Sequence, residues 1–257
     1  MKYKFLLLPA ILLATVTFGF AKAPVLYEIR IYHLQNRDQE ARVDRYLKDA
    51  LLPALQRSGI PKVGVFKPLV TDSLAGKRIY VLIPFRSAAE FARLPQRLGR
   101  DREHRVKGED YLQAPADRAP YSRIETLLLE AFSHMPAPAV PKLNNEPSRR
   151  IYELRSYESP TEERFANKVH MFNEGGEVAL FDRLGFNAVF YGSVLSGGRM
   201  PNLMYMTAHE DMDARERNWK AFGADPEWKR LSGMDFYKNN VSRINIVFLH
   251  PTEYSGF

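Results

Sequence analysis

A short strand-like string occurs twice in the chain, and this repetition constrains the fold more than any other feature. The string reads YEIRIY at 27–32 and YELRSY at 152–157, with the first Tyr, the Glu, the Arg and the last Tyr in common. The same order of signals follows each copy: a helix that ends at Gly, two alternating apolar segments, a second helical region and a last apolar segment that begins with Ser-Arg-Ile. Self-similarity over such a length predicts two copies of one supersecondary unit.

Local sequence signals place the boundaries of the first helix in each copy. Asn36 is predicted to cap this helix in the first copy, and Ser159 to cap its counterpart, with Glu162 completing a capping box. Gly59 and Gly185 are predicted to end the two helices, because Gly adopts the left-handed conformation that a helix C-terminus commonly requires.

Period-two alternation of apolar residues identifies four strands in each copy. They span 27–32, 62–70, 78–85 and 122–132 in the first copy, and 152–157, 186–195, 203–208 and 242–250 in the second. The order is βαββαβ twice, which predicts an α+β fold built from two ferredoxin-like units. We expect the units to span 24–132 and 149–257, joined by a semi-rigid Pro-rich linker over 133–148.

The N-terminal segment has the pattern of a secretory signal peptide. Lys2 and Lys4 precede an apolar run over 5–20, and small residues follow it. We expect residues 1–21 to be the signal peptide, with an uncleaved N-terminal anchor as the alternative. The protein is then exported, periplasmic or extracellular, with no stable membrane span after signal removal.

Composition excludes several classes of site. The chain contains no Cys, so it has no disulfide framework, thiolate nucleophile or zinc-thiolate site. A formal net charge of +7 on 257 residues is modest and favours solubility over nucleic-acid binding. Neither a nucleophile elbow nor a P-loop, dinucleotide fingerprint or HExxH motif is present. We therefore expect no metal, no cofactor and no nucleic-acid partner.

Several of these features resemble the NIPSNAP family: the YEIRxY-type first strand, the helix that ends in Gly, the string DPEWKRL at 225–231 and the tandem copies. The resemblance implies two ferredoxin-like units whose sheets pack into a dimeric-type α/β barrel, either within the chain or between chains. Related barrel families include cofactor-free monooxygenases and haem-degrading enzymes, a likeness of fold that assigns no chemistry. The first copy departs from the pattern, since LGRDREHR at 98–105 replaces FGADPEWKR.

The repeated strings contain the first group of candidate ligand-binding residues. Alternation places three polar side chains of each string on one face: Glu28, Arg30 and Tyr32 in the first copy, and Glu153, Arg155 and Tyr157 in the second. We expect the apolar face to meet the helices and this polar face to meet the opposing sheet. Ion pairs there would fix the register of the two sheets, because an unpaired buried charge is costly. The alternative is a polar barrel interior that binds an anionic or hydroxylated ligand.

The first helix of the second copy contains the candidate catalytic residues. His170, Glu174 and Glu177 are spaced to share one flank of a continuous helix, with Asn173 beside them as a candidate ligand contact. Gly175 and Gly176 lie within the same segment, where each costs about 1 kcal/mol relative to Ala and indicates a kink or a close backbone approach. The alternative is a solvated helix edge with weak ion pairs.

A third candidate group is aromatic. Trp219, Phe222 and Trp228 are predicted to cluster next to a helix start at which Asp225 is the cap and Pro226 the first residue. The cluster is expected either to pack in the core or to form one wall of an apolar ligand pocket.

The sequence leaves three functions open. The first is a small-molecule-binding or protein-interaction module for a small apolar or anionic ligand, because no strong catalytic motif is present. The second is a cofactor-independent, monooxygenase-like enzyme that acts on an apolar oxygenated substrate through the His170 flank. The third is a structural self-assembling unit, and we expect a homo-oligomer.

Overall fold

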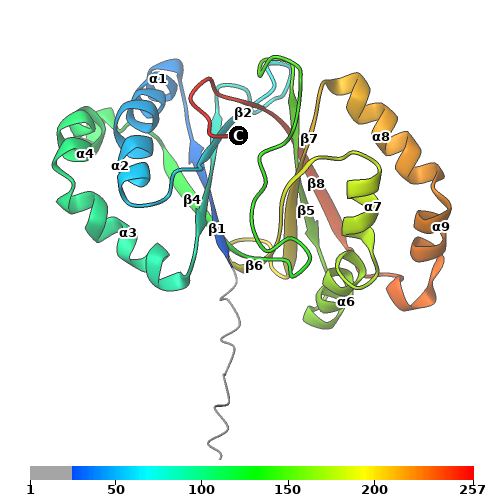
Figure 1. Cartoon of the computed structure of the whole chain (residues 1–257). Coiled ribbons are helices and arrows are strands. Elements are labelled where there is room, and N and C mark those ends of the chain that lie inside the picture. The colour runs from blue at the N-terminus through cyan, green and yellow to red at the C-terminus, as the bar shows by residue number, and fades with distance from the viewer. Residues whose placement is uncertain (1–24) are drawn as a thin grey trace, which may run out of the picture.

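A computed structural model describes residues 25–257, and its central feature is a closed barrel of eight strands (Figure 1). The strands are β1 Leu26–His33, β2 Gly64–Pro68, β3 Arg78–Phe85, β4 Arg123–Ala131, β5 Ile151–Glu158, β6 Ala188–Ser196, β7 Asn202–His209 and β8 Arg243–Pro251. The predicted signal peptide lies outside the described residues. Within them, no helix is both long and apolar enough to span a membrane.

Helices connect the strands of each half and lie outside the barrel, one set on each side (Figure 1). Those of the first half are α1 Arg37–Tyr46, the π-helical turn η1 Leu47–Leu51, α2 Leu52–Arg57, α3 Ala88–Arg100, α4 Arg102–Lys107, α5 Glu109–Leu112 and the 3₁₀ turn η2 Ala116–Arg118. Those of the second half are α6 Glu162–Phe172, α7 Glu177–Arg183, α8 Met212–Ala224, α9 Pro226–Gly233 and the 3₁₀ turn η3 Asp235–Tyr237.

The strand order around the barrel is β1-β3-β2-β8-β5-β7-β6-β4, and all neighbours are antiparallel. Each half therefore has the order β4-β1-β3-β2 or β8-β5-β7-β6, which is that of a ferredoxin-like unit. The halves join at two places, the β2–β8 seam and the β4–β6 seam. The predicted fold class is confirmed, and the barrel closes within one chain.

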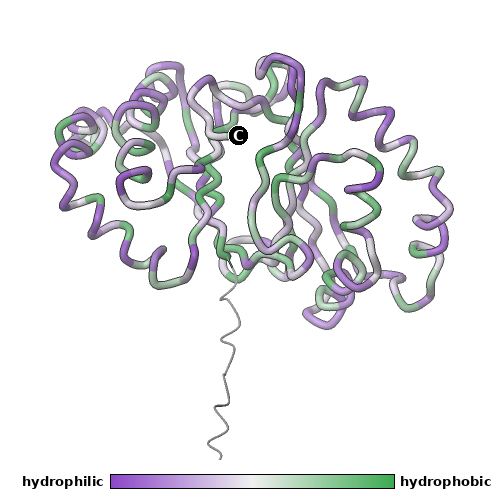
Figure 2. Tube along the Cα trace, in the orientation of Figure 1, coloured by the Kyte–Doolittle hydropathy of each residue, from purple (hydrophilic) through white to green (hydrophobic). Residues whose placement is uncertain are grey.

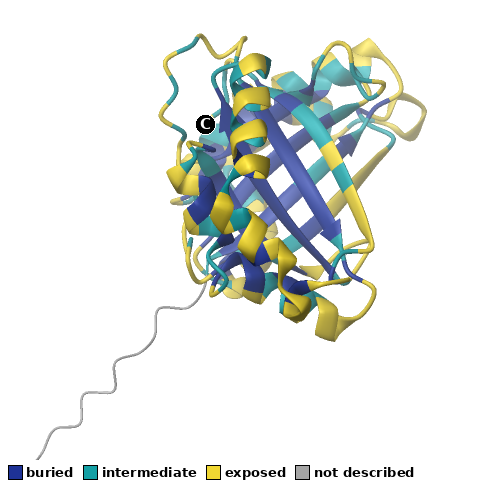
Figure 3. Cartoon of the chain, turned by 90° about the vertical axis from the view of Figure 1, so that its right-hand side faces the viewer, coloured by how far each residue is buried: buried dark blue, intermediate teal, exposed yellow. Residues whose placement is uncertain are grey.

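The barrel interior is an apolar core. One cluster of buried side chains contains residues from all eight strands, including Tyr27 and Ile29 of β1 and Tyr152 and Leu154 of β5. Two further clusters lie between the outer faces of the strands and the helices, one in each half. Figure 2 shows the apolar colour along the strands, and Figure 3 shows buried strands beneath helices whose outer faces are exposed.

The predicted faces of the repeated strands are reversed in the structure. Tyr27 and Ile29 point into the barrel, whereas Tyr32 packs among the helices of the first half. In the second half, Glu153 is bonded to Arg215 of helix α8. The inside of an eight-stranded barrel is filled by side chains and offers few donors for a charge, whereas a helix can supply them. The prediction that these charges pin one sheet to the other is therefore wrong.

Most of the predicted helix boundaries are confirmed. Asn36 caps α1 through a 2.9 Å bond from the Gln39 N–H, and Gly59 and Gly185 adopt φ values of +85° and +75°. Asp225 caps α9.

The predicted N-cap at Ser159 is wrong, because Thr161 caps α6 by accepting a bond from the Arg164 N–H. Ser159 is bonded elsewhere: its hydroxyl donates to the Asn240 carbonyl at 2.7 Å.

The Gly pair of the second half interrupts the helix instead of bending it. Helix α6 ends at Phe172, Gly176 adopts a φ of +89°, and α7 begins at Glu177. A Cβ atom on Gly175 would lie 2.5 Å from the Met171 carbonyl oxygen and 2.9 Å from the Tyr237 hydroxyl. Close backbone approach therefore explains Gly175, and left-handed geometry explains Gly176.

We expect Gly175→Ala to lower the free energy of unfolding by about 1–3 kcal/mol, because the added methyl group overlaps backbone atoms that cannot move aside. Gly223→Ala in α8 is the matched control, since a Cβ there meets no atom within 4 Å and Ala favours a helix. Urea denaturation of both variants measures the difference. Equal stability of the two variants would contradict the packing argument.

Candidate functional site

One end of the barrel, here called the barrel mouth, is lined by polar side chains. Along each of six strands, the row of inward-pointing apolar residues ends there in a polar one. These residues are His33 on β1, Arg78 on β3, Glu125 on β4, Ser156 on β5, Asn202 on β7 and Asn245 on β8. On β1, the inward residues Tyr27 and Ile29 belong to the apolar core, and Ile31, next to His33, packs against that core and lines the mouth. The interior thus changes from apolar to polar toward the mouth.

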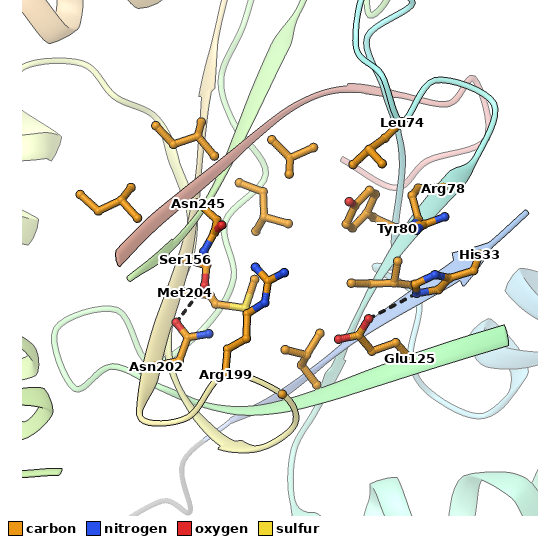
Figure 4. Close-up of a pocket in the computed structure, with 17 residues that line it drawn as sticks. His33, Leu74, Arg78, Tyr80, Glu125, Ser156, Arg199, Asn202, Met204 and Asn245 are labelled. Carbon is orange, nitrogen blue, oxygen red and sulfur yellow. Dashed lines mark hydrogen bonds and ion pairs between the residues drawn. The ribbon is translucent and has the colours of Figure 1, made fainter. Parts of the chain in front are cut away.

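A cavity of about 540 Å³ opens at the barrel mouth (Figure 4). Both halves of the chain line it. The first half contributes Tyr80 and Leu127 beside the polar residues of its strands, and the second half contributes Leu154 and Met204. Volumes of about 300–1,000 Å³ with apolar walls and a few polar groups are typical of small-ligand sites.

Hydrogen bonds orient several polar groups at the mouth. The His33 Nε2 atom lies 3.3 Å from a carboxylate oxygen of Glu125, across the β1–β4 pair. The Ser156 hydroxyl donates to the Asn202 side chain at 3.0 Å. Burial raises the pKa of Tyr80 to about 12, so its hydroxyl stays protonated at neutral pH.

Two guanidinium groups reach the cavity from different elements. Arg78 begins β3, and Arg199 lies in the loop between β6 and β7 with a φ of +64°. The nearest carboxylate to Arg199, that of Glu158, is 3.9 Å away, and the Arg199 side chain is 58% exposed. Figure 4 shows this side chain extending between the two walls. The cavity therefore presents a guanidinium group that is held only weakly by protein carboxylates.

The residues of the barrel mouth were not among those predicted from the sequence. The signal lies in the strand pattern: Ser156 follows Tyr152 and Leu154 in the inward phase, and Asn245 precedes Val247 and Leu249 in theirs. A polar residue that ends such a row marks the mouth, but only after the apolar face has been assigned to the barrel interior. The prediction placed the apolar face against the helices, so this pattern could not be recognised in the sequence.

The candidate residues of the second repeated string belong to a separate buried network. The Glu153 carboxylate accepts bonds from Arg155 Nε at 2.7 Å, Trp219 Nε1 at 2.8 Å, and Arg215 Nε and Nη2 at 3.0 Å. Arg155 also donates to the Tyr157 hydroxyl at 2.7 Å and lies 3.9 Å from the ring centre of Trp219. This Glu153 network joins strand β5 to helix α8.

The first half has a reduced counterpart of this network. Glu28 accepts bonds from Arg30 at 2.8 and 3.1 Å and from Thr126 at 3.2 Å. Arg215 and Trp219 stand four and eight residues after the N-cap of α8, where the corresponding positions of α3 are Phe91 and Pro95. The helix of the first half therefore offers no side-chain donor to Glu28.

Burial and charge act in opposite directions within the Glu153 network. Burial alone raises the pKa of Glu153, but the Arg215 bond and the Arg155 charge outweigh it and hold this pKa below its ordinary value. His209 lies 3.8 Å from Glu153 and is fully buried. Burial lowers the pKa of His209 to about 4 despite that carboxylate, so its ring is neutral at pH 7.

His170 and the three residues predicted to lie beside it do not form one site. His170 is exposed and lies 2.9 Å from the Tyr237 hydroxyl, and Glu174 is also exposed. Glu177 is buried and accepts a 2.9 Å bond from Lys168. The prediction that these residues share one helix flank required a continuous helix, and the chain is not helical between Phe172 and Glu177.

Asn173 lies apart from this group, because its side-chain oxygen accepts bonds from Ser133 and His134 in the linker.

The predicted aromatic cluster is present and packs in the second half. Ring centres lie 5.4 Å apart for Trp219 and Phe222, and 4.3 Å apart for Phe222 and Trp228. These rings belong to the cluster between sheet and helices and do not line the barrel mouth. Among residues 25–257, no group of three or more His, Cys, Asp or Glu side chains is placed to hold a metal ion.

Comparisons with known proteins agree with this architecture. The NIPSNAP family model matches residues 152–256. No curated protein matches the chain.

Solved structures with this architecture include a monooxygenase-like protein from Lactobacillus acidophilus NCFM, with a TM-score of 0.57, 10% identity and coverage of 89% of this chain and 94% of that one. A monooxygenase-like protein from Fusobacterium nucleatum subsp. nucleatum also has a TM-score of 0.57, with 8% identity and coverage of 90% and 94%. A NIPSNAP-like domain protein from Burkholderia xenovorans is 23% identical over 42% of this chain and 89% of its own, with a TM-score of 0.35.

We expect Glu153→Gln to lower the free energy of unfolding by about 3–5 kcal/mol, because it leaves the buried Arg155 and the partly buried Arg215 without their anionic partner. Glu28→Gln is the matched variant in the first half and should cost less, because it leaves only Arg30 unpaired. Urea denaturation at pH 7 compares the two. Equal losses would show that the helix-borne donors do not strengthen the second network.

The free energy of unfolding should also decrease as the pH is lowered, because His209 is buried in its neutral form. In the unfolded chain this imidazole takes up a proton as the pH falls through 6.5, whereas the folded imidazole stays neutral down to about pH 4. Acidification between these values therefore favours the unfolded state, by about 2–3 kcal/mol at pH 4.5 relative to pH 7. His209→Gln should remove this component from urea denaturation measured at both pH values. An unchanged pH dependence in the variant would contradict the assignment.

Proposed function

We propose that this chain, whose residues 152–256 are a NIPSNAP domain, is a binding module that takes a ligand with an apolar body and an anionic group at the barrel mouth. The observation that carries the proposal is the cavity of about 540 Å³ at the mouth, with an apolar inner wall and guanidinium groups at its rim. Export from the cell is part of the proposal and is supported by the predicted signal peptide at 1–21.

The inner wall of the cavity suits the apolar part of such a ligand. Leu127, Leu154 and Met204 contribute to it and lead into the apolar core of the barrel. Transfer of a hydrocarbon segment from water onto such a surface contributes about 0.8 kcal/mol for each buried CH₂ group.

The rim of the cavity suits an anionic group. Arg78 and Arg199 both line it, and the carboxylate of Glu125 that lies nearby is hydrogen-bonded to His33. Guanidinium groups bind carboxylates and phosphates through paired N–H donors, which makes these bonds stronger than neutral ones. The loop that holds Arg199 is outside the apolar wall, so the head group of the ligand would lie toward solvent.

The enzyme hypothesis has less support. It depended on His170, Glu174 and Glu177 acting together, but the hydrogen bonds of His170 and Glu177 go to Tyr237 and Lys168, and none of the three side chains lines the cavity. The likeness to monooxygenase-like proteins, at 8–10% identity, concerns the fold. Catalysis and self-association both stay predictions from the sequence.

We expect the unmodified protein to bind decanoate, a carboxylate with an unbranched apolar chain, and Arg199→Asn to weaken binding about tenfold through loss of a charge-assisted bond. Asn tolerates the left-handed backbone at position 199, so the substitution removes the charge without a new conformational demand. Isothermal titration calorimetry with decanoate and with decanol measures the effect.

Arg217→Asn is the control for this experiment, because it removes the same charge from an exposed position of α8 outside the cavity. Equal affinity of the unmodified protein for decanoate and decanol, or an equal loss in both variants, would contradict the anion site.

A further inference from the structure

The barrel wall has a vacant strand position at the mouth. In the second half, β6 runs nine residues, from Ala188 to Ser196, whereas its counterpart β2 runs only five, from Gly64 to Pro68. Pro68 has no backbone N–H and suits the end of a strand. After Leu69 the chain of the first half leaves the sheet, and Val70 is 89% exposed.

Strand β3 begins at Arg78, which lies level with Pro68 in the β2–β3 register, so beyond Leu69 neither β2 nor β3 continues and the space beside β8 holds no strand of residues 25–257. The cavity of the barrel mouth lies in this space. Its lining includes Arg78 from β3 on one side and four consecutive residues of β8, Ile244 to Val247, on the other. Consecutive residues line a space together only when the edge of their strand faces it.

The edge of β8 presents free backbone groups to the missing strand position. The Phe248 carbonyl accepts a 3.1 Å bond from the Leu69 N–H, which is the last backbone bond of the β2–β8 seam in this direction. Hydrogen bonding alternates along a strand. The N–H and C=O groups of Ile246 and Ile244 therefore point the same way, and no strand between residues 25 and 257 pairs with them there.

At the other seam, within the described residues, β4 is unpaired over the equivalent stretch, but its edge does not face the cavity. There the pairing ends where Ser196 of β6 meets Leu128 of β4, the counterpart of Phe248. The loop that follows packs against β4, since a Cβ on Gly197 would lie 3.2 Å from the Leu127 side chain. Strand β4 lines the cavity only with its inward residues Glu125 and Leu127, so the unpaired edge that the cavity exposes is that of β8.

We propose that the partner of the barrel mouth is an extended peptide of about four residues, which adds to the edge of β8 as the missing strand and presents a carboxylate to Arg199 and Arg78. This proposal rests on the proposed function and specifies its ligand. Strand addition satisfies the free groups of Ile244 and Ile246 with main-chain hydrogen bonds, and side-chain contacts then select the sequence.

The surroundings indicate the chemistry of the peptide. Side chains that point inward from the added strand would meet Leu154 and Met204. Those that point outward would lie beside Ile244 and Ile246, whose side chains are 50% and 39% exposed. Apolar residues therefore suit both faces of the peptide. Its carboxylate, at the C-terminus or on a side chain, complements the two guanidinium groups at the rim.

The experiment uses the acetylated tetrapeptide Leu-Val-Leu-Glu with a free C-terminus, the same peptide N-methylated at its two central amides, and decanoate. Affinity is measured by isothermal titration calorimetry, and amide hydrogen exchange is followed by NMR. We expect the unmodified peptide to bind, to slow exchange at Ile244 and Ile246 at least tenfold, and to lose at least tenfold in affinity on N-methylation, because the methyl groups block hydrogen bonding to β8.

The outcomes distinguish this inference from the proposed function. Binding of decanoate without binding of the peptide would overturn strand addition and leave the anion site intact. Equal affinity for the methylated and unmethylated peptides would also overturn strand addition. Absence of binding by all three probes would overturn both proposals. Slow exchange at Ile244 and Ile246 in the free protein, together with a dimer in sedimentation, would overturn the peptide in favour of a second copy of this chain.

Discussion

Continuous hydrogen bonding around an eight-stranded barrel is the constraint on which the rest of the structure depends. Closure gives the sheet an inside and an outside, and the inside is too narrow for water once side chains fill it. Apolar residues therefore occupy the interior, and charged residues that the strands carry must find partners outside the wall, on neighbouring strand positions or in the helix layer. The Glu153 network and the polar barrel mouth both follow from this division, the first outside the wall and the second where the interior meets solvent.

Much of the fold could be predicted from the sequence because its signals are local and occur twice. Alternation marked the strands, and Asn36, Gly59 and Gly185 marked helix ends. The faces of the strands could not be assigned in this way, because both faces of a barrel strand are buried and alternation does not say which is inside. Bonding by Arg215 and Trp219, far along the chain, decides the position of Glu153.

The candidate site was missed for a related reason. A site built from the ends of six strands has no contiguous motif, and each of its residues taken alone looks like an ordinary polar strand end. The sequence instead drew attention to His170 and Glu177, whose spacing suggests a shared helix face. The left-handed backbone at Gly176 separates them, and a Gly pair in a sequence does not by itself distinguish a bend from a break.

Closure within a single chain frees the two halves from symmetry. In a barrel made of two identical subunits, every feature of one half recurs in the other, so a wall opened at one seam is opened at both and a network built once is built twice. Here β2 is short where β6 is long, and α8 carries donors that α3 lacks. One half of this barrel can therefore maintain the packing of the molecule while the other half changes.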